Sequence, residues 1–169
     1  MIKNIFYSLF LITLILSCGK TEESSDDVKK EQVLVDTEFK YYVENVKEKL
    51  RKYSVSENKI SKIDDVTIEF GDIHRKNGKE KVAGFCVVKY TKKIVYSQRI
   101  TIDISQWHSF SSKYKTEIIA HELGHCAWGL KHDHTEDQIM SEILTNITEP
   151  KWHIFAEQII KSSDNIRNI

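Results

Sequence analysis

Apolar residues return every three or four positions over residues 37–53, and this spacing predicts an amphipathic helix. Asp36 or Thr37 can cap its first turn, because a short polar side chain accepts hydrogen bonds from free backbone N–H groups. A second helical pattern begins at Ser111 or Ser112 and ends near Trp128. The apolar faces of both helices are expected to pack in a core.

A third helix is predicted near the end of the chain. Thr148, Glu149 and Pro150 form a start signal, with proline in the first helical turn. The buried face of this helix is expected to contain Trp152, Phe155, Ala156, Ile159 and Ile160. His153 lies off that face and is expected to be exposed.

Between the first two helices, the pattern takes the two-residue period of strands. Residues 66–70 alternate, and residues 82–90 form an apolar run that is typical of a buried strand. Residues 94–105 predict a further strand region, with a break near residues 97–99 left open. Together these elements predict an α+β fold with a helix, a twisted sheet of roughly three to five strands, a long helix and a C-terminal helix.

The first residues differ from this pattern and predict export. Residues 1–17 contain Lys3 and then a short apolar run, which is typical of a secretory signal peptide. Ile15-Leu16-Ser17-Cys18 looks like a bacterial lipobox, which implies acylation of Cys18 and a place in the cell envelope. A plain signal peptide with an incidental cysteine is the alternative. Residues 18–33 are polar and are expected to be a flexible tether.

The balance of charged residues bears on which kinds of molecule the protein can bind. The chain has 169 residues, with 25 basic and 25 acidic side chains and a net charge of zero. No basic surface for nucleic acid is indicated. We expect one domain over residues 34–169, in a monomer held at a membrane by its lipid.

The most informative stretch is H-E-x-x-H over residues 121–125. On a helix, His121 and His125 lie on one face and can bind one metal ion, while Glu122 lies beside them and can reach a metal-bound water. Catalytic zinc takes three protein ligands and keeps one open position. Gly129 can take the left-handed conformation that ends a helix, so His132 is the expected third ligand.

Other third ligands stay open at this point. His134 lies in the polar loop just after His132. A carboxylate on a later helix is a further option, and the candidates are Glu142 and Glu149.

These residues resemble the metzincin signature, H-E-x-x-H-x-x-G-x-x-H followed by a Met-turn, with Met140 at the turn position. Three residues separate His125 from Gly129 here, where the family has two. A closer resemblance is to small bacterial lipoproteins described as zinc metallopeptidases, which carry a HELGHC core and a later Ile-Met pair. It covers roughly residues 82–141.

The resemblance implies a zincin-like fold and one Zn²⁺ per chain. It also implies zinc-dependent hydrolysis of peptide bonds, with Glu122 activating the water and Met140 forming an apolar floor beneath the metal. In such folds an edge strand pairs with extended substrate, and we expect residues 99–104 to supply that edge. The alternative function is a catalytically weak, zinc-binding interaction lipoprotein on the same fold.

Two cysteines are left once Cys18 is assigned to lipid. Cys86 lies in a predicted core strand, and Cys126 lies on the packing face of the predicted metal-binding helix. An exported compartment permits a disulfide between them, which would join helix to sheet directly behind His125. Two buried free thiols are the alternative.

Overall fold

The computed structural model describes residues 32–73, 82–91, 95–133, 138–142 and 148–162. The predicted signal peptide, the predicted lipidation site Cys18, most of the predicted tether and His134 lie outside the described residues. The α+β prediction is confirmed, with five α-helices and one three-stranded sheet in the described chain. In order, the elements are α1 (Thr37–Lys52), α2 (Glu57–Ile60), the 3₁₀ helix η1 (Ser61–Asp65), β1 (Thr67–Gly71), β2 (Gly84–Tyr90), β3 (Val95–Asp103), α3 (Ile104–Trp107), α4 (Ser112–Trp128) and α5 (Glu149–Lys161).

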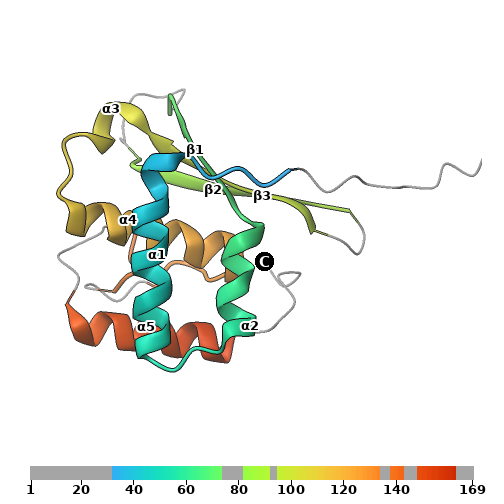
Figure 1. The fold of residues 1–169 in the computed structure, drawn as a ribbon, viewed down its shortest axis with the longest axis vertical. Helices are drawn as coiled ribbons and strands as arrows, with labels where there is room; N and C mark the ends of the chain where they lie inside the picture. Colours follow the sequence, from blue (N-terminus) through green and yellow to red (C-terminus); the bar gives the residue numbers. More distant parts are fainter. Residues whose placement is uncertain (1–31, 74–81, 92–94, 134–137, 143–147, 163–169) are drawn as a thin grey trace, which may run out of the picture.

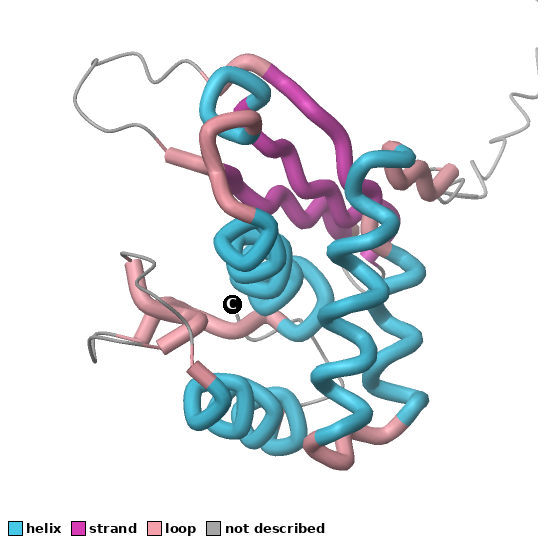
Figure 2. Tube along the Cα trace, turned by 60° about the vertical axis from the view of Figure 1, so that its left-hand side comes forward, coloured by secondary structure: helices cyan, strands magenta, loops and turns pink. Residues whose placement is uncertain are grey.

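The sheet is mixed and has the strand order β1-β3-β2. β1 runs parallel to β3, and β2 runs antiparallel to it, with Gly84 opposite Ile102 and Cys86 opposite Ile100. Helices α1, α4 and α5 lie on the same side of this sheet (Figures 1 and 2). One face of the sheet therefore packs on helices.

Two strand predictions are wrong. Residues 99–104 do not supply an edge, because β3 is the central strand and runs without a break through residues 97–99. Residues 82–90 do not form a buried strand, because β2 is an edge strand whose Phe85 and Val87 are about 40% exposed. Cys86 is consequently half-buried rather than in a core strand. Hydropathy reports how apolar a segment is, but it does not report where the segment lies in the sheet.

The long helices lie where their patterns predict them. Asp36 caps α1 by accepting a hydrogen bond from the N–H of Glu38, and the apolar face of α1 is buried. In α5, Trp152, Phe155, Ala156 and Ile159 are buried, and His153 is exposed. Ile160 is 47% exposed, so its predicted burial is wrong. One side of a helix has room for only about 100° of packed surface, and Ile160 falls beyond it.

Three short elements were not predicted: α2, η1 and α3. α2 and η1 follow α1 and contribute Ile60 and Ile63 to the core, and α3 contributes Trp107. Helices of four or five residues are too short to show a period, so tertiary packing rather than pattern determines them. Within the described residues, no helix has the length and apolar character needed to cross a bilayer.

Candidate metal centre

Helix α4 carries the H-E-x-x-H residues through the middle of the molecule. Ser111 caps its start by accepting a hydrogen bond from the N–H of Tyr114. The helix is buried almost all round: its core side includes Ile119, Leu123 and Cys126 at 0% exposure, while His121 and Glu122 are only 7% and 5% exposed. Polar side chains this deeply buried need partners, and those partners define the site.

Gly129 ends α4 in the left-handed conformation, with φ 65° and ψ 29°. The N–H groups of Gly129 and Leu130 donate to carbonyl oxygens of the last turn, on His125 at 3.0 Å and on Gly124 at 2.9 Å respectively. A side chain would be strained at this φ, so the glycine allows the sharp reversal. The reversal returns the chain toward α4 and delivers His132.

The structure brings the three predicted histidine ligands together. Nε2 of His125 lies 3.2 Å from Nε2 of His121 and 3.1 Å from Nε2 of His132, and the remaining pair is 3.3 Å apart. Three ring nitrogens on a triangle this small can share one metal ion. We call these residues the histidine cluster.

Backbone carbonyls orient two of these rings. Nδ1 of His121 donates to the carbonyl oxygen of Ile139, and Nδ1 of His125 donates to that of Leu130, each at 2.6 Å. A carbonyl can only accept, so both Nδ1 atoms carry the proton and both Nε2 atoms of the neutral rings present a lone pair. Two facing lone pairs repel, and a cation between them removes the repulsion.

Burial also keeps these rings neutral. Burial, together with the neighbouring His125 and His132, lowers the pKa of His121 to about 4 against the opposing hydrogen bond to Ile139. Burial likewise lowers the pKa of His125, with a smaller opposing contribution from the hydrogen bond to Leu130. Neutral imidazole is the form that binds a metal, so both rings are ready for one at neutral pH.

Met140 forms a tight turn directly against α4. The N–H of Ser141 donates to the carbonyl of Gln138 across the turn, and the N–H of Asp133 donates to the carbonyl of Met140 at 2.8 Å. Met140 is fully buried, and a Cβ built on Gly124 would lie only 2.3 Å from its sulfur. Gly124, between the two helix ligands, therefore makes room for the turn.

Glu122 lies on α4 beside the histidine cluster, under the first residue of β2. Burial raises the pKa of its carboxyl to about 8. A Cβ built on Gly84 would lie 3.1 Å from both Cγ and Oε1 of Glu122, so the backbone of β2 rests on this side chain. The carboxylate is thus confined between α4 and the edge of the sheet.

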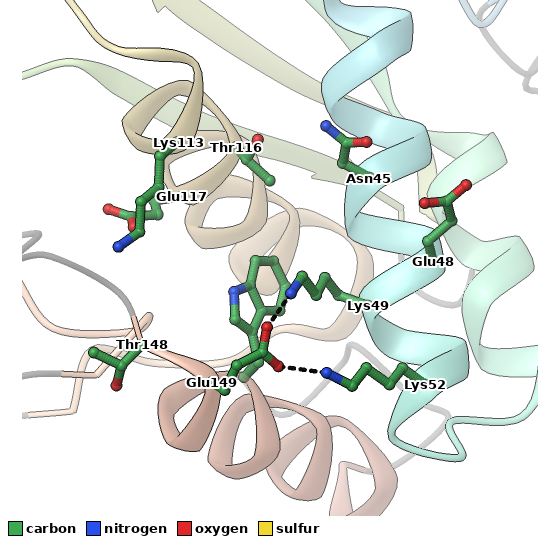
Figure 3. A pocket seen from close by; sticks show the side chains of 10 residues that line it. Asn45, Glu48, Lys49, Lys52, Lys113, Thr116, Glu117, Thr148 and Glu149 are labelled. Atoms are coloured by element: carbon green, nitrogen blue, oxygen red, sulfur yellow. Dashed lines mark hydrogen bonds and ion pairs between the residues drawn. The ribbon is translucent and has the colours of Figure 1, made fainter.

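None of the alternative candidates for the third ligand is part of the histidine cluster in the described structure. Glu149 is outside the histidine cluster: its carboxylate accepts hydrogen bonds from Lys49, Lys52 and Tyr53. Figure 3 shows Lys49 and Lys52 of α1 reaching this carboxylate. The three side chains line a pocket of about 550 Å³ between α1 and the N-terminal ends of α4 and α5. Glu142 is exposed and also outside the cluster, and His134 lies outside the described residues.

A disulfide joins Cys86 of β2 to Cys126 of α4, with the two Cα atoms 5.6 Å apart. Cys126 follows His125 directly, and its carbonyl accepts a hydrogen bond from the buried Gln98 side chain of β3 at 2.6 Å. The end of α4 that carries His121 and His125 is thereby fixed to both β2 and β3.

The sequence predicts the cysteine pair as a candidate disulfide. It does not predict the roles of Gln98, Gly84, and the carbonyls of Leu130 and Ile139.

The fold and the site together define a class: an α+β protein whose central helix, helix-ending glycine and following turn assemble three histidines able to hold a metal ion. No protein-family model, curated protein or solved structure matches the chain. The assignment of function therefore rests on the site itself.

Proposed function

We propose that this protein is a zinc-dependent endopeptidase with a metzincin-like, zincin-type fold, held at a bacterial cell envelope as a lipoprotein. The observation that carries the proposal is the convergence of three Nε2 atoms beside a buried glutamate one residue after the first ligand. Three histidines with a fourth position left for water or substrate are a ligand set of catalytic zinc.

The nitrogen distances support zinc. Zinc–nitrogen bonds of about 2.0–2.1 Å in tetrahedral geometry place two ligand nitrogens about 3.3–3.4 Å apart. The cluster has 3.1–3.3 Å between its Nε2 atoms, close to that value. When bound, the ion would act as a Lewis acid that polarises the scissile carbonyl and lowers the pKa of water.

Glu122 supplies the proton transfers. Its carboxylate accepts a proton from the attacking water and returns it to the leaving amine. Burial raises the pKa of Glu122, so its carboxylate holds an accepted proton more firmly than an exposed glutamate would. The walls provided by Gly84 and α4 restrict the carboxylate to few orientations.

The edge strand β2 is suited to hold an extended peptide. Among the described strands it pairs with β3 alone, and its first residue lies at Glu122. An unpaired strand edge offers N–H and C=O groups to a peptide backbone. We therefore propose β2, in place of residues 99–104, as the strand that aligns the substrate.

The proposed membrane anchor is a lipid on Cys18. An acylated Cys18 would hold the protein at the membrane, and residues 18–33 would separate it from the bilayer. The first contacts of the described chain with the sheet are at Leu34, whose carbonyl accepts from the N–H of Ile68 at 2.8 Å. Peptides or proteins of the envelope are then the substrates within reach.

The test uses the untagged full-length chain in detergent micelles with a mixed peptide library. We expect cleavage with zinc, loss of cleavage with a chelator, and loss of cleavage in Glu122→Gln with zinc still bound. Glu117→Gln is the matched control, because Glu117 is another buried carboxylate of α4 outside the histidine cluster. Its cleavage per bound zinc should match that of the wild type.

Two other outcomes separate the alternatives. Absence of cleavage with one zinc per chain would contradict peptide hydrolysis and favour a zinc-binding interaction lipoprotein. A folded sample with neither cleavage nor zinc would overturn the assignment of His121, His125 and His132.

A further inference from the structure

Two of the contacts between β2 and α4 lie close to each other along both elements. At the first, Gly84 rests on Glu122, with 3.1 Å from a built Cβ to Cγ and Oε1. At the second, the disulfide connects Cys86 to Cys126. The strand residues are two apart and the helix residues four apart.

The two-residue spacing on the strand and the four-residue spacing on the helix cover nearly the same distance. Two residues of a strand advance about 6.6–6.8 Å and return to the same face. Four residues of an α-helix advance about 6.0 Å and also return to nearly the same face. Because the two lengths nearly agree, holding Cys86 against Cys126 also holds Gly84 against Glu122.

Besides these two contacts, β2 is positioned by its antiparallel pairing with β3, and its own side chains add little packing on the helix. Alternate residues of the strand face away from α4, and Phe85 and Val87 are about 40% exposed there. On the helix side, Gly84 has no side chain, Cys86 is used in the disulfide, and Val88 is only half-buried. The other edge of β2 has no partner strand among the described residues.

We propose that the Cys86–Cys126 disulfide is the positioning element of this site: it holds Gly84 over Glu122, and its reduction lowers peptide hydrolysis without releasing the metal. The proposal rests on the function proposed above and adds its control by redox state. A dithiol breaks the S–S bond by exchange; each cysteine sulfur gains one electron and one proton, and the dithiol is oxidised to its own disulfide.

None of the proposed metal ligands lies in β2. His121 and His125 come from α4, and His132 follows the Gly129 turn. The carbonyls that orient two of the rings belong to Leu130 and Ile139, neither of which lies in β2. Opening the disulfide is therefore expected to move β2 away from Glu122 while the histidine cluster stays assembled.

The experiment compares four zinc-loaded full-length proteins: wild type, wild type with a dithiol, the double variant Cys86→Ser/Cys126→Ser, and Gly84→Ala. Amide hydrogen exchange, zinc content, kcat and KM are measured on each. We expect amides of β2 to exchange at least about tenfold faster in the two proteins without the disulfide, while α4 amides keep their rates. Zinc content should stay at one per chain.

A displacement near 1 Å at a catalytic group lowers turnover by roughly 100-fold. We expect losses of about 10–100-fold in kcat for both disulfide-free proteins and for Gly84→Ala, which keeps the disulfide but pushes on Glu122. Gly71→Ala is the matched control, because its Cβ would meet Cγ2 of Thr101, 2.6 Å away on the same sheet, and not Glu122. It should lower stability and leave kcat per zinc unchanged.

The outcomes are separable. Unchanged β2 exchange without the disulfide overturns the proposal whatever the activity. Faster β2 exchange with wild-type kcat also overturns it. Faster β2 exchange and unchanged zinc in a protein whose wild type cleaves no peptide supports the link between β2 and α4, and rejects the endopeptidase function alone.

Discussion

Nδ1 of His121 lies 2.6 Å from the carbonyl oxygen of Ile139, eighteen residues further along the chain. This hydrogen bond connects one member of the histidine cluster on α4 to the turn that contains Met140. The same turn presses Met140 against Gly124, so the helix and the turn are assembled as one unit. A change at either contact should therefore be felt at the metal centre.

Gly124→Ala tests this coupling. In an ordinary helix interior, glycine to alanine stabilises by up to about 1 kcal/mol. Here the new Cβ would lie 2.3 Å from the sulfur of Met140, so we expect destabilisation of about 1–3 kcal/mol from overpacking. Urea unfolding of the metal-free protein measures this, and a stabilised variant would contradict the packing.

Met140→Ala provides the control for that prediction. Removing the long side chain opens space at the position of the clash, so the double variant should be less destabilised than the sum of the two single variants. Additive effects would mean that Gly124 and Met140 are not coupled. Zinc affinity, measured on the same proteins, should fall in Gly124→Ala because Ile139 moves with the turn.

His132→Ala should remove most of the metal affinity. Changing even an outer partner of a ligand lowers affinity by about 10–100-fold, so loss of a ligand should exceed about 100-fold. Zinc per chain after dialysis, measured by atomic emission, checks this. His153→Ala is the control, because His153 is an exposed histidine of α5 outside the histidine cluster.

Metal removal should lower the melting temperature. A ligand that binds only the folded state stabilises it by about 2.7 kcal/mol at 100 times Kd and by about 4.1 kcal/mol at 1,000 times Kd. We expect Tm to rise with added zinc, return with chelator, and stay constant in His132→Ala. Equal zinc-induced shifts in wild type and His132→Ala would exclude His132 as a ligand.

The sequence predicts α1 and α4 to within one residue because long amphipathic helices bury a regular stripe. It predicts the meeting of His121 and His125 because helix geometry is local, and that of His132 because Gly129 sets a short turn. The order of strands depends on contacts between residues far apart in the sequence. The pattern therefore predicts residues 99–104 at an edge of the sheet, although β3 is the central strand. The contact of Gly84 with Glu122 also joins residues far apart in the sequence, so no sequence pattern predicts it.

Hydrogen bonds from side chains to main-chain carbonyls also cannot be predicted from a sequence pattern. Any residue can offer a carbonyl, so nothing marks Leu130 or Ile139 as the acceptors that orient the histidines. Glu149 shows the converse. Its position at the start of a helix permits a role as metal ligand, but its three hydrogen-bond donors come from α1 and the residue after it, about 100 positions earlier.

The last prediction concerns the pH dependence that Glu149 gives to stability. Hydrogen bonds from Lys49, then from Lys52 and Tyr53, lower the pKa of its carboxyl to about 2, against an ordinary value of 4.5. A lowered pKa means that the folded state holds the proton less tightly than the unfolded state. The resulting stabilisation is complete above about pH 4.5 and disappears as the pH falls toward 2.

Glu149→Gln should therefore be less stable than the wild type at pH 7 and equal to it near pH 2, with the gap closing between pH 4.5 and 2. Thermal unfolding of the metal-free proteins across this range measures the gap. Glu157→Gln is the control on the same helix, because the pKa of Glu157 is lowered mainly by Lys161 and then by His153. Because both of these neighbours form exposed pairs four residues from Glu157, which contribute little, its gap at pH 7 should be the smaller of the two. A gap for Glu149→Gln that persists unchanged at pH 2 would show that packing at the start of α5, and not the charge of Glu149, links this helix to α1.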